Sequence, residues 1–211
     1  MTDQTLTTGR SLSEFTAQLA SAQPAPGGGG AAALAGALAA SLAAMAANVT
    51  AANPRYADRH DALATLAASC DAQRTTLLAL IDADAAGFLP LQRAYAIPKD
   101  DPTRAARLAD AAHTACLAPL AMLEHCEQVA LLLPAALSTA SPLLYSDVGC
   151  AAALCSAAAE AAELNVLVNT GLLAPDDRTA TEARGARLRA TVVQCCAQTA
   201  DAVRAALRGE G

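Results

Sequence analysis

The most regular apolar pattern in the chain lies between residues 24 and 54, a stretch without a charged residue. It opens on two prolines and the glycine run Gly27–Gly30. Large apolar side chains then recur three or four positions apart, on one helix face, and alanine fills nearly all other positions. These side chains are Leu34, Leu38, Leu42, Met45 and Val49. Because small residues allow close approach from every side, the pattern predicts a central helix with neighbours packed against its backbone.

The same stretch is long enough to cross a membrane. Alanine and glycine contribute little to insertion, however, and the stretch has neither an aromatic belt nor flanking Lys/Arg clusters. We therefore predict no membrane partner. A glycine run before a helix presents free N–H groups that bind anions, but alone it is a weak signal. A purely structural core helix with a flexible glycine start is the alternative.

Helical periodicity continues along the rest of the chain. A short helix is expected from Ser11 or Ser13 to about Ser21, because Ser11 and Glu14 have the spacing of a capping box. Pro90 and Pro134 are expected to kink or end the helices that they follow. The longer helices are expected over about residues 56–89, 102–133, 147–170 and 175–207.

Composition favours helices over strands. Alanine and leucine carry most of the 54% hydrophobic content, aromatic residues make up 2%, and valine and isoleucine are too sparse for a large sheet. We predict an all-α fold: a multihelical bundle around the Ala/Gly-rich helix, with residues 1–10 disordered and residues 11–211 forming one domain. Since alanine buries little surface per helix, a homodimer interface is expected to add to the core.

Charge and cysteine usage limit the partners. The net charge of −6 argues against nucleic acid. The polar N-terminus has no signal-peptide pattern. The seven cysteines lie mostly in helical patterns, where reduced cysteine acts as a small hydrophobe, so a cytoplasmic location is expected. Because no four-ligand set occurs, we predict no metal site.

Polar residues on the helix expected from Asp147 are candidates for a site. Asn165 and Asn169 share a face with Asp147, but Asn165 lies about 27 Å further along a straight helix. One small ligand therefore cannot touch both ends within a chain, whereas a dimer can bring both ends near separate pockets. Bonding between helices is the alternative role for the two asparagines, and stabilisation of the helix dipole is the alternative for Asp147.

Lys99 is the only lysine among 14 basic residues, and it lies in a proline-flanked turn. We interpret it as a contact to substrate or to a catalytic carboxylate, with a solvated loop lysine as the alternative. Asp82 and Asp84 are two positions apart on a helix. They point to different faces, so at most one is expected to face a pocket.

Four segments in order resemble the cyclodeaminase/cyclohydrolase family of folate enzymes, and together they span nearly the whole chain. The segments are Pro24-Ala25-Pro26-Gly27-Gly28-Gly29 through Thr50, Asp82-Ala83-Asp84 through Lys99, Ala118-Pro119-Leu120, and Ser146-Asp147-Val148-Gly149 through Asn169. Two positions depart from the family pattern. Gly30 stands where serine is common, and Ala52-Asn53-Pro54-Arg55-Tyr56 replaces a Gly-Lys-Lys-x-Tyr segment.

The resemblance implies an all-helical homodimer that acts on the methenyl or formimino bridge of tetrahydrofolate. Without an attached formiminotransferase, methenyltetrahydrofolate cyclohydrolase is the expected activity. Formiminotetrahydrofolate cyclodeaminase and a non-catalytic folate-binding dimer are the alternatives, and a helical protein without a ligand is a third. Neither reaction needs a metal or redox cofactor, so none is expected beyond the folate substrate.

The resemblance also assigns roles to residues. Asp147 or Asp82 would stabilise the cationic bridge, and Lys99 would shuttle a proton or orient water. The Gly27–Gly30 amides would receive an anionic part of the ligand. Asn48, Asn165 and Asn169 would hold the pterin or the bridge, and Arg55 and Tyr56, with Arg59, would take the place of the lysine-rich segment at the glutamate tail.

Overall fold

The computed structural model describes residues 7–209, which form six α-helices, three short 3-10 helices and no strand. The predicted all-α fold is confirmed. The α-helices are α1 (Leu12–Leu19), α2 (Gly28–Ala51), α3 (His60–Tyr95), α4 (Arg104–Thr139), α5 (Tyr145–Thr170) and α6 (Pro175–Arg208). The 3-10 helices are η1 (Thr7–Gly9), η2 (Pro54–Arg59) and η3 (Pro142–Leu144).

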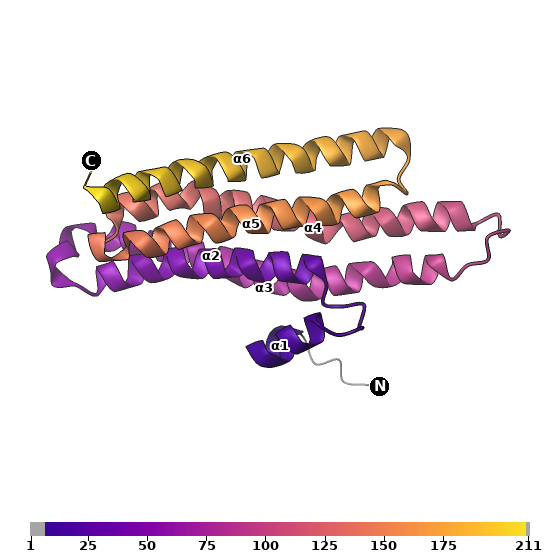
Figure 1. The fold of residues 1–211 in the computed structure, drawn as a ribbon, viewed down its shortest axis with the longest axis horizontal. Coiled ribbons are helices and arrows are strands. Elements are labelled where there is room, and N and C mark those ends of the chain that lie inside the picture. Colours follow the sequence, from indigo (N-terminus) through magenta and orange to yellow (C-terminus); the bar gives the residue numbers. More distant parts are fainter. Residues whose placement is uncertain (1–6, 210–211) are drawn as a thin grey trace.

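The five long helices lie side by side in one elongated bundle (Figure 1). Helix α2 packs against α3, α4 and α5, and α6 packs against α4 and α5. The hairpin between α3 and α4 extends past the other helices at one end, and α1 lies outside the bundle beside the segment that leads into α2 (Figure 1). Ser11 caps α1 with Glu14 in the predicted capping box.

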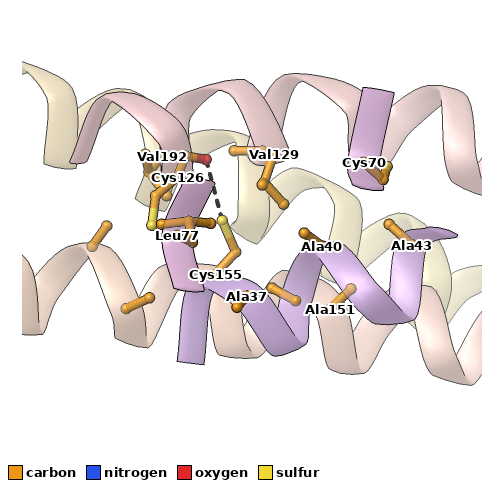
Figure 2. Packing of buried hydrophobic residues seen from close by; sticks show 14 of the residues in the cluster. Ala37, Ala40, Ala43, Cys70, Leu77, Cys126, Val129, Ala151, Cys155 and Val192 are labelled. Atoms are coloured by element: carbon orange, nitrogen blue, oxygen red, sulfur yellow. Dashed lines mark hydrogen bonds between the residues drawn. The ribbon is translucent and has the colours of Figure 1, made fainter. Parts of the chain in front are cut away.

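Small side chains set the close packing of α2. Ala33, Ala40 and Ala43 are fully buried, and Figure 2 shows Ala40 and Ala43 among the buried side chains of the core. A methyl group added to Gly36 would lie 3.1 Å from the Sγ atom of Cys126 and 3.3 Å from Leu77. The alanine-rich faces therefore bring neighbouring helices close to the α2 backbone, as the sequence predicts.

The face of α2 that carries its large side chains is open in the single chain. Leu38, Met45 and Val49 are 45%, 37% and 51% exposed, while the alanine-rich faces lie inside. The expectation that helices pack on α2 from every side is therefore wrong for this face. The physical reason is that alanine and glycine allow a closer helix approach than leucine or methionine does, so the bundle closes on the small residues.

Two predicted helix ends are also wrong. Helix α3 continues through Pro90 to Tyr95, and α4 continues through Pro119 and Pro134 to Thr139. A proline inside a helix costs about 3 kcal/mol. Buried side chains beyond each ring offset this cost: Leu91 and Ala94 pack against the start of α4, and Ala136 lies in the main core.

The remaining boundaries differ less from the prediction. Helix α5 begins at Tyr145, two residues before Asp147, and α6 begins at Pro175 as expected. Within the segment predicted to be disordered, residues 7–9 form η1, and residues 1–6 lie outside the described part of the chain.

Cysteines behave as small hydrophobic residues in this core. Five of the seven are buried and none of the seven forms a disulfide. Burial raises the pKa of Cys70 and of Cys116 to about 11, so both stay protonated at neutral pH. The Cys155 thiol donates a hydrogen bond to the Cys126 carbonyl at 3.3 Å (Figure 2).

By length and composition alone, three stretches could cross a membrane: Gly28–Ala51, Arg104–Thr139 and Pro142–Thr170. More than half of the most apolar window in each of the first two is buried inside the bundle. The absence of a membrane partner stays a prediction.

Candidate active site

A cavity of about 290 Å³ lies where the glycine start of α2 meets α3 and the C-terminal end of α5. Three chain segments supply most of its wall, and α4 adds Ala115. The lining residues are Pro24, Ala25, Gly27, Gly28 and Gly29 from the first segment, Asp84, Ala85, Phe88, Leu91 and Tyr95 from α3, and Asn165, Val168 and Asn169 from α5. The structure thus brings together three segments that are far apart in the sequence.

The segment before α2 is held in place by local contacts. Pro26 is buried, the Ala25–Pro26 peptide bond is cis, and the Gln18 side chain donates a hydrogen bond to the Ala25 carbonyl at 2.9 Å. Gly27 is the N-cap residue, and no side chain caps the helix. The first N–H groups of α2, with the positive end of its dipole, therefore lie at the cavity wall.

At two positions, glycine leaves room for a polar side chain to lie against the backbone. A methyl group on Gly29 would overlap the carboxylate of Asp84. A methyl group on Gly28 would lie 3.2 Å from the Nδ2 atom of Asn165. Because Gly28 and Gly29 have no side chains, the Asp84 carboxylate and the Asn165 amide can approach the N-terminus of α2 closely. This is a physical reason for the glycine run.

Among the described residues that line the cavity, Asp84 is the only acidic one. Burial raises the pKa of its carboxyl group above the ordinary value of 3.8. Among residues 7–209, none donates a hydrogen bond that would oppose this shift. A desolvated carboxylate beside a helix N-terminus can accept a proton or stabilise a nearby positive charge.

The two asparagines lie one turn apart on α5. The Nδ2 of Asn165 donates to the Ala161 carbonyl at 2.8 Å, and the Nδ2 of Asn169 donates to the Asn165 carbonyl at 2.9 Å. The Nδ2 of Asn169 also donates to the Ala115 carbonyl of α4 at 3.4 Å. This is a hydrogen bond between helices, which is the alternative role that the sequence analysis gave to the asparagines. The amide oxygens are the groups left to accept hydrogen bonds from a ligand.

An aromatic wall faces these polar groups. Phe88 and Tyr95 come from α3 and are 37% and 52% exposed. They lie four and eleven residues after Asp84, and Leu91 lies seven residues after it. This is the spacing of one helix face, so the periodicity that marks core positions could also have identified this wall in the sequence.

Three predicted residues do not line the cavity: Asp82 on α3, Lys99 in the turn after it and Gly30 on α2. Asp82 accepts hydrogen bonds from the Thr7 N–H at 2.7 Å and the Thr8 hydroxyl at 3.1 Å. Lys99 is exposed in the turn after α3. Gly30 is buried beneath the Pro26 ring. Of the two aspartates, Asp84 is the one that faces a pocket.

Four other predicted residues lie at the opposite end of α2, which is about 36 Å long for its 24 residues. A hydrogen bond of 2.9 Å from the Ser141 N–H to the Thr50 hydroxyl places the α4–α5 turn at that end. The four are Asn48, Arg55, Tyr56 and Asp147, and none of them lines the cavity within this chain. Figure 1 shows the two ends at opposite sides of the bundle.

The residues of the described chain form no group of three or more His, Cys, Asp or Glu side chains that could hold a metal ion. The cavity therefore offers one carboxylate, helix N–H groups, two amides and an aromatic wall. Such a site can bind a planar polar ring that carries a positive charge, and it can move a proton at Asp84.

Comparison with known proteins identifies the family of this chain. The family model described as formiminotransferase-cyclodeaminase matches residues 11–189. This chain belongs to that family.

Two relatives cover most of the chain. It is 34% identical over 177 residues to the methenyltetrahydrofolate cyclohydrolase of Methylorubrum extorquens, covering 82% of this chain and 84% of the relative. The crystal structure of formiminotetrahydrofolate cyclodeaminase from Thermotoga maritima matches with a TM-score of 0.83 and 26% identity, over 95% of this chain and 96% of that chain.

Proposed function

We propose that this chain is a folate one-carbon enzyme that acts on the methenyl or formimino bridge of tetrahydrofolate, and that methenyltetrahydrofolate cyclohydrolase is its main activity. The observation that carries the proposal is the desolvated Asp84 carboxylate beside the glycine start of α2. The methenyl bridge is a cationic amidinium, and a partly buried carboxylate stabilises such a charge more strongly than an exposed one. The higher identity to the cyclohydrolase relative supports this choice.

The cavity suits the bicyclic head of the substrate. At about 290 Å³ it is near the lower limit of about 300 Å³ for ligand pockets, so the head group would enter and the glutamate tail would stay outside. Phe88 and Tyr95 offer faces against which a planar pterin can stack. The amide oxygens of Asn165 and Asn169 would accept hydrogen bonds from the pterin N–H groups.

Asp84 would act as a general base in the hydrolysis. The oxygen of a water molecule forms a bond to the methenyl carbon, and Asp84 accepts the proton that this water loses. The bond from this carbon to one of its two nitrogens then breaks. That nitrogen takes the remaining hydroxyl proton, and formyltetrahydrofolate leaves. The raised pKa makes Asp84 a stronger base than an exposed aspartate.

Formiminotetrahydrofolate cyclodeaminase is the second candidate activity, favoured by the structural match over nearly the whole chain. In that reaction a folate nitrogen bonds to the formimino carbon and passes its proton to the terminal nitrogen, which takes a second proton from an acid. The bond between the carbon and this terminal nitrogen then breaks, and ammonia leaves. The cationic methenyl bridge is the substrate of the first reaction and the product of the second, so Asp84 could stabilise its charge in either. Neither changes an oxidation state, so no redox cofactor is proposed.

The roles of Asp147 and Lys99 stay predictions, because neither lines the cavity of this chain. The carboxylate role that the resemblance gave to Asp147 or Asp82 is proposed for Asp84 instead. We also propose that the protein is a homodimer, supported by the exposed apolar face of α2. A cytoplasmic location is proposed on the basis of seven cysteines without a disulfide, which fits a reducing compartment.

The test is turnover of both substrates by the purified protein. We expect the methenyltetrahydrofolate absorbance to decay faster with protein than in buffer, with no ammonia formed. Ammonia release from formiminotetrahydrofolate would instead establish the cyclodeaminase. A rise in melting temperature with 5-formyltetrahydrofolate but no turnover would show a folate-binding protein, and no response in any assay would reject the proposal.

A further inference from the structure

A second cavity, of about 440 Å³, lies between the end of α3 and the start of α4. It is near the hairpin that extends past the other helices in Figure 1. Its lining includes Arg93, Ala94 and Ile97 from α3 and Arg107, Asp110 and Thr114 from α4. None of these six residues lines the candidate active site, so the proposed folate function leaves this cavity without a role.

Two arginines, one from each helix, line this cavity. Within residues 7–209, the side chains of Arg93 and Arg107 form no ion pair and no hydrogen bond, although Arg104 beside them donates from its Nε to the Ile97 carbonyl at 2.9 Å. One arginine that faces only water is ordinary on a protein surface. Two that share a cavity whose lining also includes the buried Ala94 attract an anion with less screening by solvent.

Asp110 limits the charge that a ligand can carry here. Among the described residues that line this cavity it is the only acidic one, so two arginines and one aspartate leave a net charge of +1. A group with a single negative charge balances this lining, whereas a phosphate dianion would exceed it. A carboxylate also matches the paired N–H groups of a guanidinium. The charge and the geometry therefore favour a monocarboxylate.

The cavity continues into a third one, of about 510 Å³, and the two share Thr114. The lining of this third cavity contains no charged residue among the described ones, and it includes Leu80, Ala83 and Gly87 from α3 and Leu117, Ala118 and Ala121 from α4. We call the two linings together the α3–α4 groove. Because Leu80 and Arg93 are thirteen residues apart on α3, the groove is about 20 Å long, charged at one end and apolar along the rest.

We propose that the α3–α4 groove binds a long-chain carboxylate. The carboxylate lies between Arg93 and Arg107, and the hydrocarbon chain runs along the apolar part toward Leu80. Each cavity is in the size range of ligand sites, which are mostly apolar with a few placed polar groups. The chain would cover Leu117, which is 54% exposed without a ligand. This site is separate from the proposed folate function and does not depend on it.

Calorimetric titration with sodium dodecanoate, below its critical micelle concentration, tests the charged end. We expect one binding site per wild-type chain. Arg93→Ala and Arg107→Ala should each weaken binding at least about tenfold, because each removes a charge-assisted hydrogen bond. Arg187→Ala is the matched control, since Arg187 is an exposed arginine of α6 outside the groove. No binding by the wild type, or equal affinity of all four proteins, would overturn the proposal.

A change in the apolar part tests where the chain lies. Ala83→Glu places a carboxylate in this part and should weaken dodecanoate binding at least about tenfold. Ala72→Glu is the matched control, because Ala72 is also exposed on α3 but lies outside the groove. Helical circular dichroism of both variants should equal that of the wild type. Equal affinities of the two variants would overturn the proposed position of the chain.

Two further ligands separate this site from general detergent binding. Octanoate has four methylene groups fewer than dodecanoate and should bind at least about tenfold more weakly, because each buried methylene adds affinity. Dodecyltrimethylammonium has the same chain length as dodecanoate but a positive head, which the two arginines repel, and it should not bind. Equal binding of either ligand and dodecanoate would overturn the proposal.

Two other occupants of the groove would give different results. If a second copy of the chain covered it, Ala83→Glu would sediment more slowly than Ala72→Glu. If a lipid surface covered it, the wild type would sediment with phosphatidylglycerol vesicles and Arg93→Ala would not. We expect neither result, and either would overturn the proposal. All of these measurements are made without folate, so the groove and the proposed function are accepted or rejected separately.

Discussion

Polar residues lie near both ends of α2, but their surroundings differ. At its start, Asp84 and Asn165 lie against glycine backbone inside a cavity. At its far end, Asn48 and Arg55 are exposed to solvent in the single chain. The reactivity of a carboxylate or an amide depends on how far its surroundings exclude water, so the start of α2 is the end where chemistry is expected.

The contrast between Asp84 and Asp82 shows the same effect within two residues. Burial raises the pKa of Asp84, whereas Asp82 accepts hydrogen bonds from Thr7 and Thr8 on another face of α3. The sequence alone does not show which of two nearby aspartates faces a pocket. Which aspartate faces the pocket is clear only in the folded chain, where the segment before α1 packs against α3 and covers Asp82.

The largest predicted effect in this comparison follows from filling the space at Gly29. Gly29→Ala is expected to lower kcat/KM about 100-fold, because the new methyl group would displace the Asp84 carboxylate. Overpacking of this kind should also lower the free energy of unfolding by about 1–3 kcal/mol. Turnover and urea unfolding measure the two effects.

Gly171→Ala is the matched control, since a methyl group there would meet no atom within 4 Å. It is expected to keep wild-type turnover. If Gly29→Ala were as active as this control, turnover would not depend on the position of the Asp84 carboxylate beside α2.

A smaller effect is predicted for the aromatic wall. Tyr95→Ala should lower affinity for 5-formyltetrahydrofolate about 10-fold, because stacking on a planar ring contributes about 1–3 kcal/mol. Isothermal titration calorimetry measures the affinity. Tyr95→Phe, which keeps the ring, should bind like the wild type, and equal affinities for all three proteins would place the pterin elsewhere.

The smallest effect concerns stability and pH. Because burial raises the folded-state pKa of Asp84 above 3.8, its favourable contribution to folding is complete below pH 3.8 and is lost as the pH rises through the folded-state pKa. Asp84→Asn removes the charge and should be more stable than the wild type at pH 7, with the advantage disappearing near pH 3. Urea unfolding at both pH values measures this. An advantage that is the same at both would contradict a desolvated carboxylate.

Much of the fold could be predicted from the sequence, since periodicity and alanine content indicate helices and a tightly packed α2. The chain does not stop its helices at Pro90 or Pro134, because packing beyond those residues outweighs local preference. The glycine segment and the two asparagines of the cavity were also predicted. Phe88 and Tyr95 were not, although they share a helix face with Asp84. The exposure of the large apolar side chains of α2 could not be predicted. Periodicity shows that these side chains share one helix face, but it does not show whether another helix packs on that face.

The most direct test of the central claim compares Asp84→Asn with Asp82→Asn in the methenyltetrahydrofolate absorbance assay. The two substitutions are chemically identical and two residues apart, but only Asp84 lines the cavity. We predict that Asp84→Asn retains about 1% of wild-type kcat, as expected for loss of a general base, and that Asp82→Asn retains more than about half. Equal rates for the two variants, or a larger loss at Asp82, would contradict the assignment of this cavity as the active site.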